Sequence, residues 1–451
     1  MSILKKVFPY LCLIFSLSLL IYTFYKSEIH WNGLNRDYYF VYYIISSLLI
    51  IFSVISFFIN QKIKEYLIIS AISIIFSLYF FEGYLLFKDE QLRKTQLKKE
   101  QLKKEKIYEN QTGKKYDKRN KFEFYQDLKK KNNKVRLSLG ASHYINKTDK
   151  EYSIIPLSGI SNTETITCSE NGYYAIYQSD RYGFNNPDTE WERKEIEFLL
   201  VGDSFTRGSC VNRPNDISSV LRTLSNKSVL NLGYSGNGPL TKYASLREYL
   251  NPNVKKILWV FYEGNDLNDL RNELNNKILT NYLNDLTFSQ NLKLKQKELN
   301  ELANIEIERE VEKKKQEEKK ENDKKFINNL LRFIKIYKIR ASIFTETQSQ
   351  PNLEFKKILT LAKELSIKNE SKLYFVYLPV YYRYNSNFDN SVYLSVKKIV
   401  NELDIPFIDI HNEVFNKEKN PLKLFPFELW GHYNEEGYRK VSEAILKFSN
   451  D

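Results

Sequence analysis

Residues 196–208 read IEFLLVGDSFTRG and indicate the class of fold. The apolar run predicts a strand at Phe198–Val201, covered on both faces as in parallel sheets. A Gly–Asp–Ser turn follows, and Ser204 stands on it ahead of a helical stretch. A serine there exposes its hydroxyl, and its backbone N–H lies at a helix start, where partial positive charge favours a developing oxyanion. The alternative is a serine that only caps the helix.

The same alternation of short apolar runs and helical stretches continues to the C-terminus. Further strands are predicted at Val229–Leu232, Ile257–Tyr262, Leu373–Leu378 and Phe407–Ile410, and helices at Ile217–Leu224, Leu240–Tyr249, Glu354–Asn369, Leu394–Leu403 and Asn434–Phe448. This order predicts an α/β fold with a parallel five-stranded sheet and crossover helices.

The N-terminal region contains three apolar segments: Val7–Tyr25, Tyr39–Phe58 and Tyr66–Phe87. Each is close to the roughly 20 residues that a helix needs to cross a bilayer, so three transmembrane helices are predicted. Lys5 and Lys6 before the first segment also fit a cleaved signal peptide. Since no small-residue cleavage site follows within a few residues, we expect a retained helix.

The formal net charge of +13 does not indicate a nucleic-acid partner, because 23 of the 52 lysines lie in two runs of mixed charge, 91–131 and 292–325. Alternating acidic and basic residues are typical of solvated helices with weak ion pairs. The first run directly follows the third apolar segment, where its lysines can contact anionic lipid headgroups.

These patterns predict four parts. Residues 1–88 form three transmembrane helices, residues 89–134 a charged helical linker, and residues 135–195 lead-in strands and loops. Residues 196–451 form the α/β domain, with a charged helical insertion at about 280–345.

The compartment of the α/β domain is indicated by cysteines and by flanking charge. Cys168 and Cys210 fit either a disulfide, which requires an oxidising compartment, or two unpaired half-buried thiols. Lysines after the third apolar segment favour a cytoplasmic domain, whereas the first helix with Lys5 and Lys6 favours translocation. We expect a multi-pass protein of the cell (inner) membrane with an extracytoplasmic domain.

Polar residues that follow the predicted strands are the candidate site, because ligands of open parallel sheets bind beyond the carboxyl ends of the strands. NLGYSGNGP at 231–239 supplies Gly236, whose backbone N–H can approach a ligand, although a plain turn looks similar. EGND at 263–266 supplies the side-chain amide of Asn265. A hydroxyl nucleophile needs a base, and His432, in a loop ahead of the last helix, is the best placed of four histidines.

GDSFTRG, SGNG, EGND and GHYNEEG resemble, in order and rough spacing, four sequence blocks of the SGNH/GDSL hydrolases. The resemblance spans Ile196 to Asp451 without the insertion. It implies a three-layer flavodoxin-like domain, here as a membrane-anchored bacterial member. It also implies Ser204 as nucleophile, His432 as base, and an oxyanion hole from the Ser204 N–H, Gly236 and Asn265. Neither a metal nor a cofactor is implied.

Two positions depart from the family pattern. Glu263 replaces the usual first glycine of the third block, and Leu429 stands where an aspartate usually precedes the histidine by three residues. Another acid must then orient His432, or the pair works as a dyad. Glu428, the nearest acid in sequence, and Asp409, at a strand end, are the candidates.

Three functions fit these residues. The first is an esterase that acts on an acyl ester, with O-acyl groups of a cell-surface glycan as the expected substrate. The second is a polysaccharide O-acyltransferase, which needs a multi-spanning membrane partner because three crossings are too few to carry activated acyl groups. The third is an inactive glycan-binding module, favoured by the missing aspartate. Tyrosines of YLPVYYRY at 377–384 could stack on sugars, although core packing is their commoner use.

Overall fold

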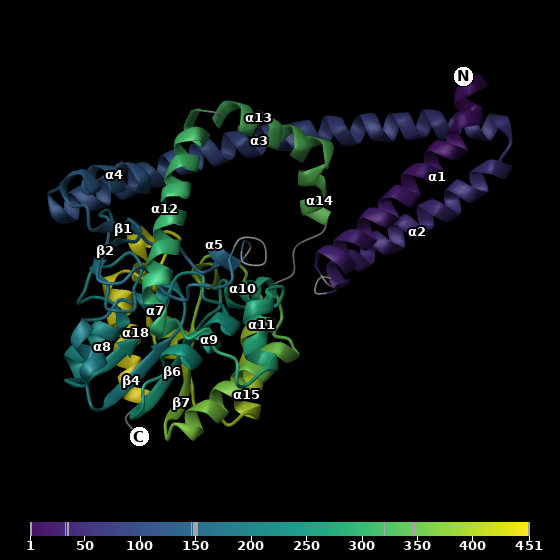
Figure 1. Ribbon diagram of the computed structural model, residues 1–451. Helices are drawn as coiled ribbons and strands as arrows, with labels where there is room; N and C mark the ends of the chain where they lie inside the picture. Colours follow the sequence, from purple (N-terminus) through teal and green to yellow (C-terminus); the bar gives the residue numbers. More distant parts are fainter. Residues whose placement is uncertain are drawn as a thin grey trace. The chain divides into compact units, whose positions relative to one another are not determined.

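The computed structural model describes residues 2–31, 33, 36–145, 147, 152–319, 321–343 and 349–449. The chain divides into two compact units (Figure 1). One unit contains Met1–Lys98 and Lys320–Thr347, and the other contains Lys99–Lys319 and Gln348–Asp451.

The first unit is helical. It contains α1 (Ser2–Phe24) with the π-helical turn η1 (Tyr25–His30), α2 (Arg36–Phe58), the first part of α3 (Gln61–Thr112), α13 (Glu321–Ile334) and α14 (Tyr337–Ile343). The three N-terminal helices are each long and apolar enough to cross a membrane. Large apolar side chains such as Phe15, Phe76 and Phe80 are exposed on them, as expected for helices that face lipid.

The second unit is built on a parallel sheet of five strands in the order β5-β4-β6-β7-β8. The strands are β4 (Ile196–Val201), β5 (Val229–Asn231), β6 (Val254–Tyr262), β7 (Lys372–Leu378) and β8 (Phe407–Asp409). The predicted α/β class and all five predicted strands are confirmed. Their continuous apolar character follows from burial on both faces.

Helices cover both faces of this sheet and give three layers. Alternate side chains of β6 point to opposite sides, so Trp259 packs in one core and Val260 in the other. The first core lies against α9 (Pro239–Tyr249), α15 (Leu353–Lys368) and α16 (Ser391–Glu402), and the second lies against α8 (Ile217–Ser225) and α18 (Glu435–Ser449). Shorter elements are α7 (Ser204–Arg207), η4 (Tyr381–Tyr384), α17 (Ile410–Glu413), η5 (Phe415–Lys417), η6 (Pro421–Leu424) and η7 (Pro426–Glu428).

A small second sheet precedes the parallel one in the chain. Its strands β1 (Val135–Leu137) and β2 (Glu164–Ile166) are parallel, and β3 (Ile176–Gln178) pairs antiparallel with β2. Helix α4 (Lys121–Lys131) packs on β1, and the short α5 (Ser142–Ile145) follows. The loop from β2 to β3 is joined to the segment after α7 by a Cys168–Cys210 disulfide.

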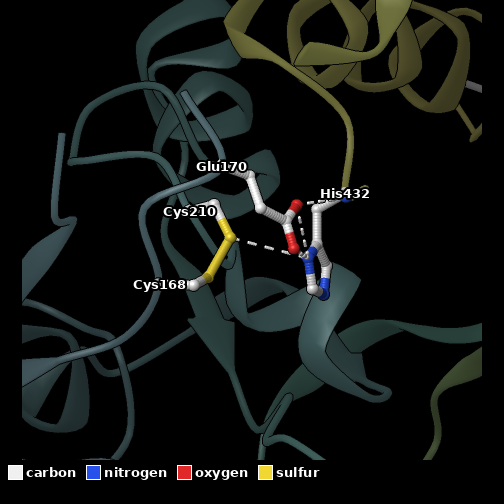
Figure 2. A group of neighbouring side chains, drawn as sticks. All are labelled: Cys168, Glu170, Cys210 and His432. Carbon is white, nitrogen blue, oxygen red and sulfur yellow. Dashed lines mark hydrogen bonds and ion pairs between the residues drawn. A yellow bond between two sulfur atoms is a disulfide. The ribbon is translucent and has the colours of Figure 1, made fainter. Parts of the chain in front are cut away.

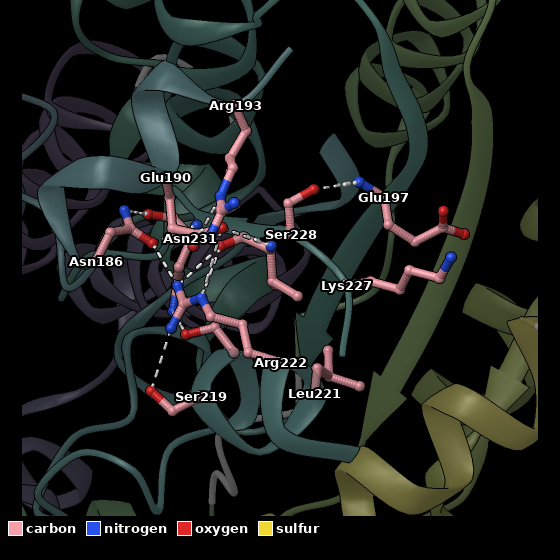
Figure 3. Close-up of polar contacts among 12 residues, drawn as sticks. Asn186, Glu190, Arg193, Glu197, Ser219, Leu221, Arg222, Lys227, Ser228 and Asn231 are labelled. Atoms are coloured by element: carbon pink, nitrogen blue, oxygen red, sulfur yellow. Dashed lines mark hydrogen bonds and ion pairs between the residues drawn. The ribbon is translucent and has the colours of Figure 1, made fainter. Parts of the chain in front are cut away.

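Strand β5 is an edge of the parallel sheet, and the segment around η2 (Asp188–Glu192) covers it (Figure 3). The side chain of Asn186 exchanges two hydrogen bonds, of 2.8 and 2.9 Å, with the backbone of Asn231. The carboxylate of Glu190 accepts the Val229 N–H at 3.0 Å. Arg222 donates to the Val229 carbonyl at 2.8 Å. These side chains form hydrogen bonds with the backbone N–H and C=O groups at the outer edge of β5. Left uncovered, such an edge would invite pairing with another chain.

The insertion between β6 and β7 is helical, as predicted. It contains α10 (Asp266–Glu273), α11 (Lys277–Asn284), η3 (Leu292–Leu294), α12 (Gln296–Lys319), α13 and α14. The first half of α12 differs from the solvated helix that its charge predicts, because Leu299, Ala303 and Ile307 are buried at a spacing of four residues.

Candidate active site

Ser204 lies at the turn from β4 into α7. A methyl group at Gly202 would lie 1.8 Å from the Thr206 hydroxyl, so this turn requires glycine. The Asp203 carboxylate accepts the Phe205 N–H at 2.9 Å and caps α7. Since α7 is a single turn of four residues, the partial positive charge at its start comes from a few backbone N–H groups and not from a long helix dipole.

The structure brings His432 to Ser204 across 228 residues of chain. Its Nε2 lies 2.8 Å from the Ser204 Oγ. The imidazole packs on the Phe205 ring with a centroid distance of 4.5 Å. Ser204 and His432, the nucleophile and base expected from the sequence blocks, are therefore brought within hydrogen-bond distance of each other.

The acid that contacts His432 is Glu170, in the loop between β2 and β3. Both carboxylate oxygens lie 3.1 Å from Nδ1, and Oε2 accepts the His432 backbone N–H at 2.5 Å. A methyl group at Gly431 would lie 2.6 Å from Oε2, so glycine permits this approach. A carboxylate at Nδ1 favours a proton there and leaves the Nε2 lone pair directed at the serine hydroxyl.

Neither acid proposed from the sequence contacts the histidine. Glu428 accepts from Asn420 at 3.1 Å, and Asp409 accepts from Tyr393 at 2.5 Å and from Lys397 at 3.0 Å. Glu428 was expected because it lies close to His432 in the sequence, and Asp409 because it lies at the end of a strand. The acid present instead lies 262 residues before the histidine, in a part of the chain outside the parallel sheet.

The disulfide holds this acid in place, because Cys168 precedes Glu170 by two residues (Figure 2). The Cys210 Sγ lies 3.6 Å from the His432 Nδ1. These four side chains are types that bind metals, and their donor atoms lie within 4.8 Å of one another. With both sulfurs bonded to each other, however, the group lacks the thiolates that a metal would require. The possible pairing of the two cysteines was the one sequence signal that pointed to this loop.

The surroundings of Glu170 favour the ionised form of its carboxyl group. Burial alone raises the pKa of its carboxyl, but the charge and hydrogen bonds of His432 outweigh burial and leave the pKa below its ordinary value. The carboxylate is thus ionised at neutral pH and can stabilise an imidazolium.

Ser204 and His432 open into a cavity of about 320 Å³ that Asn265, Tyr382 and Trp430 also line. A cavity of about 110 Å³ adjoins it and shares Asn265 and Tyr382. Ser204 and His432 therefore face an open cavity, and Asn265 lines both cavities.

The expected oxyanion donors differ in position. Asn265 begins α10 without capping it by its side chain, and its buried Oδ1 has no hydrogen-bond partner among the described residues. Asn265 lines both cavities, and its role as an oxyanion donor stays a prediction. Gly236, with φ +74°, lies against Ser142 and is absent from the lining of either cavity, where Gly264 is found instead. A role of the Gly236 N–H stays a prediction.

Glu263, the departure in the third block, has a structural partner. Its buried carboxylate pairs with Arg383 and accepts from the Tyr377 hydroxyl at 2.6 Å and the Val380 N–H at 3.2 Å. It thereby ties the end of β6 to the segment after β7, which carries Tyr382 into the cavity wall.

No family model and no curated protein matches this sequence. Solved structures similar to it include a lipolytic protein of the G-D-S-L family from Desulfitobacterium hafniense DCB-2 (13% identity, TM-score 0.33, 56% of this chain and 99% of that chain). The acetyl xylan esterase AlAXEase matches at 12% identity and a TM-score of 0.31, over 56% of this chain and 98% of that one. Axe2, an acetylxylan esterase from Geobacillus stearothermophilus, matches at 13% identity and a TM-score of 0.30, over 57% of this chain and 94% of that one.

Proposed function

We propose that this chain is a membrane-anchored serine esterase of the SGNH/GDSL type that removes short acyl groups from a cell-surface glycan. The observation that carries the proposal is the continuous hydrogen-bonded series Glu170–His432–Ser204, which opens into a cavity. A hydroxyl, a base and an acid that orients the base are the minimum set for acyl transfer through a covalent intermediate.

The reaction follows from this order. Ser204 Oγ attacks the ester carbonyl while His432 Nε2 takes the hydroxyl proton, and Glu170 stabilises the imidazolium. In this reaction the Ser204 N–H and the Asn265 amide donate hydrogen bonds to the oxyanion. The imidazolium then gives its proton to the leaving alkoxide. Water, deprotonated by His432, releases the acid and restores the serine.

Two aromatic side chains support a glycan as the substrate. Tyr377 and Tyr381 are buried, whereas Tyr382 is 49% exposed and Trp430 is 60% exposed on the lining of the cavity. Exposed rings with amphipathic faces suit the apolar C–H face of a sugar. The cavity lies near the lower end of the range for ligand pockets, about 300–1,000 Å³, which favours a short acyl group.

Two further features concern location and the acyl acceptor. The three apolar helices support a multi-pass anchor in the cell membrane, and the disulfide supports an extracytoplasmic domain. The smaller cavity beside Asn265 leaves room for an acceptor hydroxyl, so a polysaccharide O-acyltransferase with a multi-spanning partner is the second candidate.

The proposal is tested with full-length protein in detergent. The wild type should release acetate from an acetylated oligosaccharide, and a fluorophosphonate should label Ser204, as located by mass spectrometry. Ser204→Ala should abolish both, while Ser209→Ala, a buried serine of the same strand-to-helix region, should still be labelled on Ser204. Absence of labelling in a folded wild type would refute an activated serine. Acetate transfer to added glycan in excess of hydrolysis would favour the acyltransferase.

A further inference from the structure

Residues 324–343, which comprise α14 and all but the first turn of α13, present an unusual exposed surface. On α13, five apolar side chains are 44–68% exposed: Phe326, Ile327, Leu330, Leu331 and Ile334. Their spacing of one, three and four residues places them on one face of the helix. An exposed apolar face of this kind marks a surface that a membrane or another molecule covers.

This surface is attached to α3. The Tyr79 hydroxyl donates to the Ile334 carbonyl at 3.0 Å, and its ring lies 5.2 Å from that of Phe333. The carboxylate of Glu82, which is fully buried, accepts the N–H groups of Lys338 and Ile339 at 2.8 and 2.9 Å. These are the first amides of α14, which a helix leaves without internal partners.

Helix α14 also reaches α2, where Arg340 lies 5.6 Å from the centre of the Tyr42 ring. Counted from Asn60, between α2 and α3, Tyr42 is about 27 Å away and Glu82 about 33 Å away at 1.5 Å per residue. Both distances match the roughly 30 Å of a bilayer's hydrocarbon core. The contacts therefore lie at one membrane boundary, where Tyr38, Tyr39, Tyr42 and Tyr43 resemble the aromatic belt of such boundaries.

The charge of the segment suits the same location. Residues 324–343 contain six lysines and arginines and lack any acidic residue. Lys338 and Lys325 pair with Asp89 and Glu90 at 2.6 and 3.3 Å, directly beyond the third apolar segment. Lys325 pairs with Glu90, whereas Phe333 and Ile334 contact Tyr79, so α13 runs antiparallel beside α3 and begins with its basic residues where the apolar segment of α3 ends. Lysines at such a boundary can contact anionic headgroups while apolar side chains face the lipid.

We propose that α13 and α14 form a helix pair that packs beside the last part of the apolar segment of α3 and turns its apolar face to the lipid at that boundary. The insertion between β6 and β7 thus returns to the bilayer and gives the chain an attachment separate from the three N-terminal helices. The partner is a lipid surface with anionic headgroups.

The test uses full-length protein in phosphatidylcholine–phosphatidylglycerol vesicles, with Cys12 replaced by serine and the disulfide intact. A single cysteine, Ile327→Cys or Asn328→Cys, carries an environment-sensitive fluorophore. Both side chains are exposed in the structure, but only Ile327 lies on the apolar face. With nitroxide-bearing lipids, we expect quenching at 327 to exceed that at 328 at least about twofold, because only residue 327 lies on the face that is turned to the lipid.

Equal quenching at the two positions would overturn the proposal. A blue-shifted emission at 327 without quenching by lipid-borne nitroxide would overturn it as well, because a protein, such as a second copy of this chain, would then cover the face. Neither outcome depends on esterase activity, so the result is independent of the function proposed above.

Discussion

Replacement of Glu170 by glutamine tests the assignment of the acid. The Glu170 carboxylate lies 3.1 Å from His432 Nδ1, and the two side chains are 27% and 20% exposed. At an effective dielectric constant of 20, unit charges about 4 Å apart interact by about 4 kcal/mol. Since each 1.36 kcal/mol corresponds to tenfold in rate, loss of this charge should lower kcat about 10³-fold. An amide NH₂ facing Nδ1 would also favour the tautomer that cannot accept the serine proton.

The measurement is kcat on p-nitrophenyl acetate at pH 7.5, with thermal melting as the check on folding. Glu428→Gln and Asp409→Asn are matched controls, because they remove a charge from the two acids that the sequence suggested. Each should stay within about threefold of wild type, as expected for groups remote from the reacting atoms. A folded Glu170→Gln enzyme with wild-type kcat, or a larger loss in either control, would refute this assignment.

Three further results are expected. The Cys168–Cys210 bond closes a loop of 42 residues, so its reduction should remove about 4 kcal/mol of stability. Reduction also frees the loop that carries Glu170 and should lower kcat at least tenfold. Unchanged kcat in the fully reduced, folded protein would contradict this. Asn265→Ala should lower kcat about 10²–10³-fold with little change in melting temperature, if its amide donates to the oxyanion; a loss below about threefold would exclude that role. Burial acts to raise the pKa of Glu170, but His432 outweighs burial and leaves the pKa lowered in the folded protein. The ionised carboxylate therefore stabilises the fold above the ordinary carboxyl range. This stabilisation is lost as the pH falls through the lowered pKa. The difference in melting temperature between wild type and Glu170→Gln should therefore be present at about pH 5 and shrink as the pH falls below about 4; a difference already absent at about pH 5 would contradict the lowered pKa.

Much of the fold could be predicted from local sequence. Strands buried on both faces must be continuously apolar, so β4 and β6 were evident from composition alone. The first half of α12 was not, because its abundant charge hides an apolar stripe at Leu299, Ala303 and Ile307. Those three positions show the helical spacing that indicates burial.

Within the site, the sequence located Ser204 and His432, because both stand in short segments of strict geometry beside strand or helix ends. It did not locate Glu170, which belongs to an irregular loop outside the parallel sheet. An acid in a loop has no periodicity that marks it, and its contact with His432 depends on tertiary folding. The possible pairing of Cys168 and Cys210 was the only constraint in the sequence on where that loop lies.

Glu170 contacts His432 from a loop that the Cys168–Cys210 disulfide holds in place. Cytosolic thiols are kept reduced. For the extracytoplasmic location proposed above, a newly synthesised chain still in the cytosol would have its nucleophile but no fastened acid. Such a chain would turn over its substrate more slowly, and full turnover would begin only after export and oxidation.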